Sequence, residues 1–163
     1  MAEPLLKPRT VKSIASVLTV ARLKETRRLQ ALQRSEARLL EQQKLLATLF
    51  EYGAEYRKKI ADMDRAGNRL GAASLLQRQN LLAMMNQVEK MKVAQNAQVR
   101  HAEADRLRMR QAFYQAHVYA ENVQTLYEQK KYTLQEQKNR RAEKTSADEY
   151  LTRFALSTPI ASA

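Results

Sequence analysis

The chain has no cysteine, no tryptophan, and only three glycines and three prolines among its 163 residues. Without cysteine it can form no disulfide and offers no thiolate to a metal or a substrate, which suits a reducing compartment. With so few turn-forming residues, the backbone can reverse direction only once or twice. These absences exclude a disulfide-stabilised fold and disfavour a compact domain built from many short elements.

Long hydrophobic runs are also missing. No stretch of about eighteen consecutive apolar residues occurs, so no membrane-spanning helix is predicted. Residues 1–10 contain Pro4 and Pro8 and no apolar run, so we expect no signal peptide there. We therefore expect a cytoplasmic location.

A seven-residue apolar repeat runs through the first part of the chain, which is rich in Gln, Ala, Leu, Lys, Arg and Glu. One series is Val11, Leu18, Glu25, Leu32, Leu39, Leu46, Gly53 and Ile60. A second series, three residues later, is Ile14, Ala21, Arg28, Ser35, Gln42, Leu49, Tyr56 and Met63. A repeat sustained over so many heptads predicts a coiled-coil seam rather than the face of a globular helix.

The repeat breaks at residues 65–71, where Gly67 and Gly71 can end one helix and begin the next. The next helix has its own predicted seam. One series is Leu81, Val88, Gln95, Ala102, Met109, Ala116 and Val123, and the other is Met84, Met91, Gln98, Asp105, Ala112, Tyr119 and Leu126.

The two seams fit together if the chain folds back between Asn68 and Arg69. Gly53 then faces Met84, and Gln42 faces Gln95 as a polar pair that can fix the register. We therefore predict an all-α fold, a long antiparallel two-helix coiled-coil hairpin over residues 10–149. A flexible N-terminal tail is expected at 1–9 and a C-terminal tail at 150–163. The second helix should extend past the first as a polar single helix over 128–149.

Sites for catalysis or for a cofactor are not evident. There is no glycine-rich phosphate loop, no HExxH motif and no set of residues spaced for a metal. His101 and His117 are too far apart on one helix to share a metal, so we expect surface histidines. A two-helix rod also offers no cleft that excludes water. We expect no enzyme activity, no cofactor and no small-molecule substrate.

The formal net charge is +12 at pH 7, and such an excess of positive charge points to acidic partners. Residues 1–34 hold eight basic and two acidic side chains, and residues 130–141 hold five and one. In the hairpin these stretches should meet where both termini emerge. The candidate contacts with an acidic protein surface are Arg22, Lys24, Arg27, Arg28, Lys130, Lys131, Lys138, Arg140 and Arg141. The alternative is a solvated helical surface with a basic bias.

A small apolar cluster, Leu45, Leu49, Tyr52 and Tyr56, lies on the first helix towards the turn. Tyr56 falls in the predicted seam, whereas Tyr52 should keep an exposed edge beside it. Exposed aromatic side chains tend to mark contact sites, so this cluster is a second candidate binding surface.

The segment Leu49-Phe50-Glu51-Tyr52-Gly53-Ala54-Glu55-Tyr56-Arg57 precedes the turn by about ten residues. With the length of the chain and its Gln-rich basic hairpin, it resembles the FliJ family of flagellar export proteins. It is equally similar to the YscO (SctO) family of stalk proteins of virulence-associated injectisomes.

The resemblance implies a stalk that enters the pore of a hexameric export ATPase and contacts it through the end carrying the termini. It also implies contact with the export-gate membrane protein through Leu45, Leu49, Tyr52 and Tyr56. Further gate contacts on the second helix would come from among Leu75, Leu76 and Leu82. Such a protein would sit at the cytoplasmic face of the secretion apparatus and could also meet secretion chaperones.

Two other classes stay open. A generic coiled-coil adaptor, or a chaperone-escort protein, fits the hairpin equally well. A nucleic-acid-binding helical protein fits the charge. However, the sequence has no array of aromatics for base stacking and no recognisable groove-reading module, so we favour that reading less.

Overall fold

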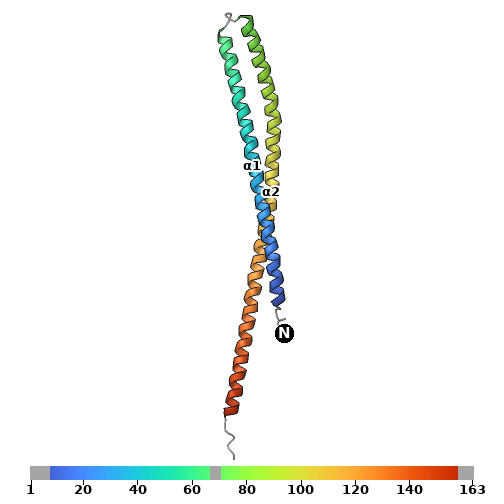
Figure 1. The fold of residues 1–163 in the computed structure, drawn as a ribbon, viewed down its shortest axis with the longest axis vertical. Helices are drawn as coiled ribbons and strands as arrows, with labels where there is room; N and C mark the ends of the chain where they lie inside the picture. Colours follow the sequence, from blue (N-terminus) through green and yellow to red (C-terminus); the bar gives the residue numbers. More distant parts are fainter. Residues whose placement is uncertain (1–7, 67–70, 158–163) are drawn as a thin grey trace, which may run out of the picture. The chain divides into compact units, whose positions relative to one another are not determined.

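The computed structural model describes residues 8–66 and 71–157, and these residues form two long helices. Helix α1 spans Pro8–Ala66 and helix α2 spans Ala72–Ser157. The described residues contain no β-strand. The two helices run antiparallel and pack against each other (Figure 1), so the predicted all-α two-helix hairpin is confirmed.

The ends of the helices follow from local chemistry. Pro8 is the first residue of α1, where its missing N–H costs no hydrogen bond. Arg65 lies in the last turn of α1, where a cation interacts favourably with the helix dipole. The carbonyl of Gly71 accepts bonds from the backbone N–H groups of Ser74 (3.0 Å) and Leu75 (3.2 Å), so Gly71 caps α2. The predicted fold-back point and Gly67 lie outside the described residues.

The chain divides into two compact units, and each contains part of both helices. Unit 1 combines residues 1–26 with residues 115–163, so it holds both ends of the chain. Unit 2 comprises residues 27–114, which include the connection between the helices.

The predicted seam of α1 is confirmed. Its positions are buried or half-buried throughout, except Arg28, which is exposed. The most buried apolar members are Val11, Ala21, Leu32, Leu39 and Ile60.

The predicted seam of α2 is half wrong. The series that begins at Leu81 is buried or half-buried, as predicted. The companion series is displaced by one residue, because five of its members are exposed: Met84, Met91, Gln98, Tyr119 and Leu126. The residues that follow Met84, Met91, Gln98 and Tyr119 lie in the seam instead, and of these Lys92, Val99 and Ala120 are buried. In a heptad repeat, successive seam residues are separated alternately by three and by four residues. We predicted that Met84, three residues after Leu81, lies in the seam, whereas in the structure Met85, four residues after Leu81, lies there.

This displacement changes how the helices pair. A methyl group added at Gly53 would lie 3.5 Å from Lys92 Nζ and 3.7 Å from Val88 Cγ1. Gly53 therefore faces Val88 and not Met84, which is one helical turn away along α2. The predicted contact between two glutamines holds, because Gln95 Nε2 donates to Gln42 Oε1 (2.8 Å) and to the Gln42 carbonyl (3.0 Å). Beside this pair, Leu39, Leu46, Val99 and Ala102 form an apolar cluster.

Helix α2 continues past the predicted boundary at residue 149 to Ser157. Side chains 138–154 are all exposed, as expected for a polar single helix. Within this stretch the Thr145 hydroxyl bonds to the Arg141 carbonyl (3.0 Å). In neither helix does a described segment have the length and apolar character needed to cross a bilayer.

Candidate partner-binding surfaces

Four large apolar side chains in unit 2 are each about half exposed: Leu45 (49 %), Tyr52 (48 %), Met84 (49 %) and Met91 (48 %). Each directly precedes a seam residue, so each lies at the edge of the helix contact. In an antiparallel pair such positions from the two helices share one flank. The equivalent residues Ala31, Arg38 and Asp105 do line one groove together. We call Leu45, Tyr52, Met84 and Met91 the tyrosine patch.

The other two members of the sequence-predicted cluster lie beneath this patch. Leu49 and Tyr56 are half-buried in the seam. Lys59 Nζ lies 5.9 Å from the centroid of the Tyr56 ring, a cation–π contact. The predicted division between a seam tyrosine, Tyr56, and a flanking one, Tyr52, is confirmed. Met84 and Met91 were missed as surface residues because they were assigned to the seam.

On the opposite flank, Phe50 contacts a buried lysine. Lys92 Nζ lies 4.5 Å from the centroid of the Phe50 ring and 2.7 Å from Glu89 Oε1. Arg57 approaches the same carboxylate at 3.9 Å. Burying an ammonium group is costly unless it is paired, and the ring and the carboxylate supply that pairing.

Arg22, a predicted ATPase contact, forms ion pairs and hydrogen bonds with other residues of unit 1. Its guanidinium donates to Glu25 (3.0 Å), to Glu121 (2.8 Å) and to Gln124 (3.4 Å). These carboxylates raise the pKa of Arg22, with Glu25 the stronger cause. The last two contacts join α1 to α2, so Arg22 is a link between the helices as well as a surface cation.

Glu25 also accepts a bond from His117 Nδ1 at 2.6 Å. The hydrogen bond from His117 is the largest cause that lowers the pKa of Glu25, followed by the bond from Arg22. His117 is partly exposed, as expected, but its contact across the helix pair was not anticipated. The one sign of this contact in the sequence was Glu25 itself, a charged residue in a seam series of α1 whose neighbouring members are apolar.

The other predicted ATPase contacts divide between the units. In unit 1 they are Lys24, Lys130, Lys131, Lys138, Arg140 and Arg141, all exposed except the half-buried Lys130. In unit 2 they are Arg27 and Arg28, both exposed. Arg140 bonds to Glu136 one turn earlier at 2.6 Å. Such an exposed pair contributes little stability, so Arg140 can change partner easily.

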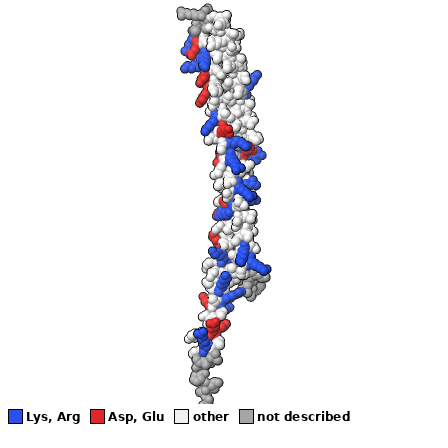
Figure 2. Space-filling view, viewed as in Figure 1, with Lys and Arg blue, Asp and Glu red and all other residues white. Residues whose placement is uncertain are grey.

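Positive charge is not concentrated in the unit that holds the chain ends. Unit 1 contains 12 basic and 8 acidic residues, whereas unit 2 contains 17 and 9. Figure 2 shows Lys and Arg side chains spread over the visible face. The larger excess lies in unit 2, which includes Arg27, Arg28 and Arg34 of the predicted basic stretch 1–34.

Among the described residues, no group of three or more His, Asp or Glu side chains is placed to hold a metal ion. His101 pairs with Asp105 at 3.2 Å on its own helix, and Arg108 contacts the same carboxylate.

No protein-family model, no curated protein and no solved structure matches the chain.

Proposed function

We propose that the chain is the central stalk of a type III secretion or flagellar export ATPase complex. The observation that carries this proposal is the tyrosine patch. Four large apolar side chains, each about half exposed, occupy one flank of the hairpin unit that contains the connection. Exposed apolar patches of this kind mark protein contact sites.

In this proposal the tyrosine patch meets the export-gate membrane protein. Leu45 and Tyr52 offer their exposed edges, and Leu49 and Tyr56 support them from the seam. Met84 and Met91 extend the surface onto α2. Methionine is flexible and polarizable, so these side chains can adapt to a partner that changes shape.

The exposed cations of unit 1, together with Arg27 and Arg28, contact the hexameric ATPase. Electrostatic complementarity supplies specificity and association rate more than raw affinity. A single asymmetric hairpin within a ring of identical subunits contacts each subunit differently. It therefore biases the subunits to different nucleotide states, which stimulates hydrolysis and couples the ring to the gate. The stalk itself binds no cofactor and carries out no reaction, and it acts in the cytoplasm beside the membrane.

The decisive measurement is the ATP hydrolysis rate of the cognate export ATPase with and without the full chain. We expect severalfold stimulation, lost when Lys24, Arg27 and Arg28 are all changed to Glu. These residues are exposed, so helicity by circular dichroism should not change. Stimulation that survives this reversal of charge would refute the ATPase contact.

The gate contact needs a separate test. Tyr52→Ala with Met91→Ala should leave ATPase stimulation intact and reduce secretion. A loss of both activities together would indicate unfolding. The competing adaptor function predicts tight binding to secretion chaperones without stimulation of the ATPase. A nucleic-acid-binding function predicts a steep salt dependence of binding to RNA or DNA.

A further inference from the structure

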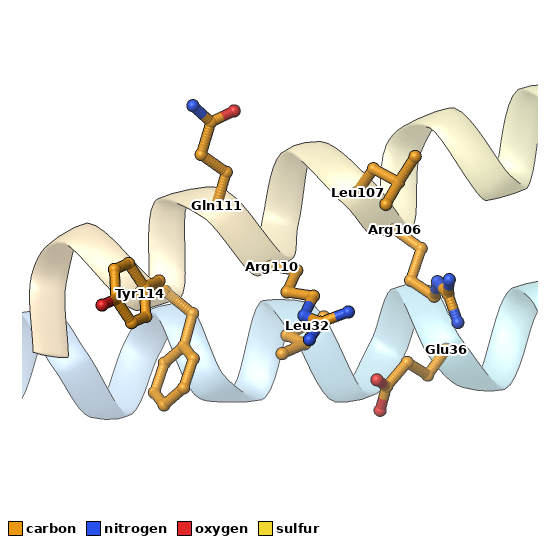
Figure 3. Close-up of a pocket in the computed structure, with 8 residues that line it drawn as sticks. Leu32, Glu36, Arg106, Leu107, Arg110, Gln111 and Tyr114 are labelled. Carbon is orange, nitrogen blue, oxygen red and sulfur yellow. The ribbon is translucent and has the colours of Figure 1, made fainter.

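A second groove in unit 2 lies on the flank opposite the tyrosine patch. Leu32 and Glu36 from α1 line it, with Arg106, Leu107, Arg110 and Tyr114 from α2 (Figure 3). Its volume is about 680 Å³. We call these six residues the arginine groove. It contains none of the residues assigned to the gate or to the ATPase.

Part of the apolar lining of this groove is open to solvent, although Leu32 is buried. Leu107 is 56 % exposed and Tyr114 is 65 % exposed. On α1, Leu29 (38 %) and Leu40 (53 %) are also exposed. They stand seven residues before and four residues after Glu36, hence on the same helix face. Together these residues extend an apolar strip, interrupted by Glu36, over about three helical turns, or roughly 16 Å at 1.5 Å per residue.

The charged part consists of two guanidinium groups without acidic partners. Arg106 and Arg110 form no ion pair among the described residues, although the carboxylate of Glu36 lines the same groove. Arg106 Nε is shielded from solvent and has no hydrogen-bond partner in the described structure. Figure 3 shows both side chains reaching from α2 towards α1. A donor left without a partner is unfavourable. Arg110 is exposed and Arg106 is half-buried, so an incoming acceptor can reach these two guanidinium groups.

We propose that the arginine groove binds an acidic amphipathic α-helix of a partner protein. An apolar face packs on Leu107 and Tyr114, as in other helix-in-groove contacts. Carboxylates of the same helix accept bonds from Arg106 and Arg110. Arginine is suited to this role because its planar fork binds a carboxylate through two parallel hydrogen bonds.

Other occupants fit less well. A small molecule needs a site that covers most of its surface, and this groove leaves its own apolar lining exposed. A nucleic acid would use the cations but gains nothing from the aliphatic strip. A second copy of this chain has a net charge of +12, so it would be repelled by the two arginines of the groove. An acidic helix with an apolar face matches both the two arginines and the exposed apolar side chains of the lining.

The test uses the full chain and a synthetic helical peptide of about four turns, with Leu on one face and Glu on the other. A second peptide has the same composition and charge in an order that scatters the Leu residues. Fluorescence anisotropy gives both dissociation constants at moderate salt. We expect the amphipathic peptide to bind at least tenfold more tightly than the scattered one.

Two variants locate the site. Leu107→Ser with Tyr114→Ser changes exposed side chains only, so the fold is retained, and it should abolish the preference between the peptides. Arg106→Gln with Arg110→Gln should weaken the amphipathic peptide about tenfold or more. The matched control is Lys58→Gln with Lys90→Gln, which removes the same charge from exposed positions of the same unit and should leave binding unchanged.

Three results would overturn the proposal. The first is equal affinity for the two peptides, which would show attraction by charge alone. The second is equal weakening by the lysine control. The third is a duplex RNA of matched charge that binds as tightly as the amphipathic peptide and is insensitive to the Leu107 and Tyr114 changes.

Discussion

The two units hold their helices together by different means. In unit 2 the contact is an apolar cluster around Leu39 and Val99, next to the neutral amide pair of Gln42 and Gln95. In unit 1 the buried apolar residues are largely alanines, and charged groups centred on Glu25 link the helices. Ion pairs also join the helices in unit 2, Arg78 with Asp64 at 2.7 Å and Arg57 with Glu89 at 3.9 Å, but these side chains are well exposed and contribute little. The seam of unit 2 therefore depends more on burial, and that of unit 1 more on ionisation and salt.

The largest effect that would test this contrast is expected from Leu39→Ala in unit 2. Leu39 is only 7 % exposed, and removing a buried leucine side chain costs about 2–5 kcal/mol. We expect a value near the lower end, because a two-helix seam can partly close around the cavity. Urea unfolding followed by circular dichroism measures it. Leu40→Ala, at the exposed neighbouring position, should change stability by less than about 0.5 kcal/mol, and an equal loss at both sites would contradict the burial argument.

A smaller effect is expected from Glu25→Gln in unit 1. The substitution preserves the shape of the side chain but removes the charge that His117 and Arg22 contact. We expect a loss of about 1 kcal/mol, which high salt should reduce in the native chain. Hydrogen exchange of the backbone around His117 would detect it. Glu143→Gln, at an exposed position beyond the paired helices, serves as the control. Full protection around His117 in the Glu25 variant would show that the network contributes nothing.

Acidification should reproduce the loss seen in that variant. The folded-state pKa of Glu25 lies below its ordinary value, because His117 and then Arg22 stabilise the carboxylate. Its stabilising contribution is therefore present above the unfolded pKa of about 4.3, and it is lost as the pH falls through the folded pKa. Hydrogen exchange around residue 117 should increase in this acidic range in the native chain but change less in Glu25→Gln. Identical pH profiles would remove Glu25 as the cause.

The smallest effect is expected from Gly53→Ala, and it should be stabilising. The new methyl group would meet Lys92 Nζ and Val88 Cγ1 at ordinary contact distances of 3.5 and 3.7 Å. Alanine is favoured over glycine inside a helix by about 0.8–1.0 kcal/mol. We expect a gain of about 0.5–1 kcal/mol in the free energy of unfolding. A loss of stability would mean that the new methyl group disturbs the packing of Lys92 and Val88.

Much of the fold follows from heptad spacing, and the error in α2 has a physical explanation. After Leu81, a step of three reaches Met84 and a step of four reaches Met85, so apolarity alone cannot choose between them. One heptad later the choice is between Met91 and Lys92, and the rule that apolar residues are buried selects the wrong one. Lys92 is buried because Phe50 and Glu89 pair with its ammonium group. The contact with Phe50 depends on the other helix and cannot be read from α2 alone.

The residues of the two candidate surfaces could be predicted from the sequence to different degrees. Leu45 and Tyr52 could be placed from α1, whose register was predicted correctly. The contribution of Met84 and Met91 depended on the α2 register and was missed for that reason. The arginine groove depends on which residues of α1 stand beside Arg106 and Arg110. Sequence spacing within one helix does not contain that information.

The hydrogen bonds of Gln95 have a further mechanical consequence. Its amide donates to both the side chain and the backbone of Gln42. Axial sliding of α2 by one turn, about 5.4 Å, would carry the amide beyond reach of both oxygens and leave it without acceptors in a half-buried position. Flanking side chains such as Ala102 are small and would resist that movement only weakly. The glutamine pair therefore limits slippage of one helix along the other.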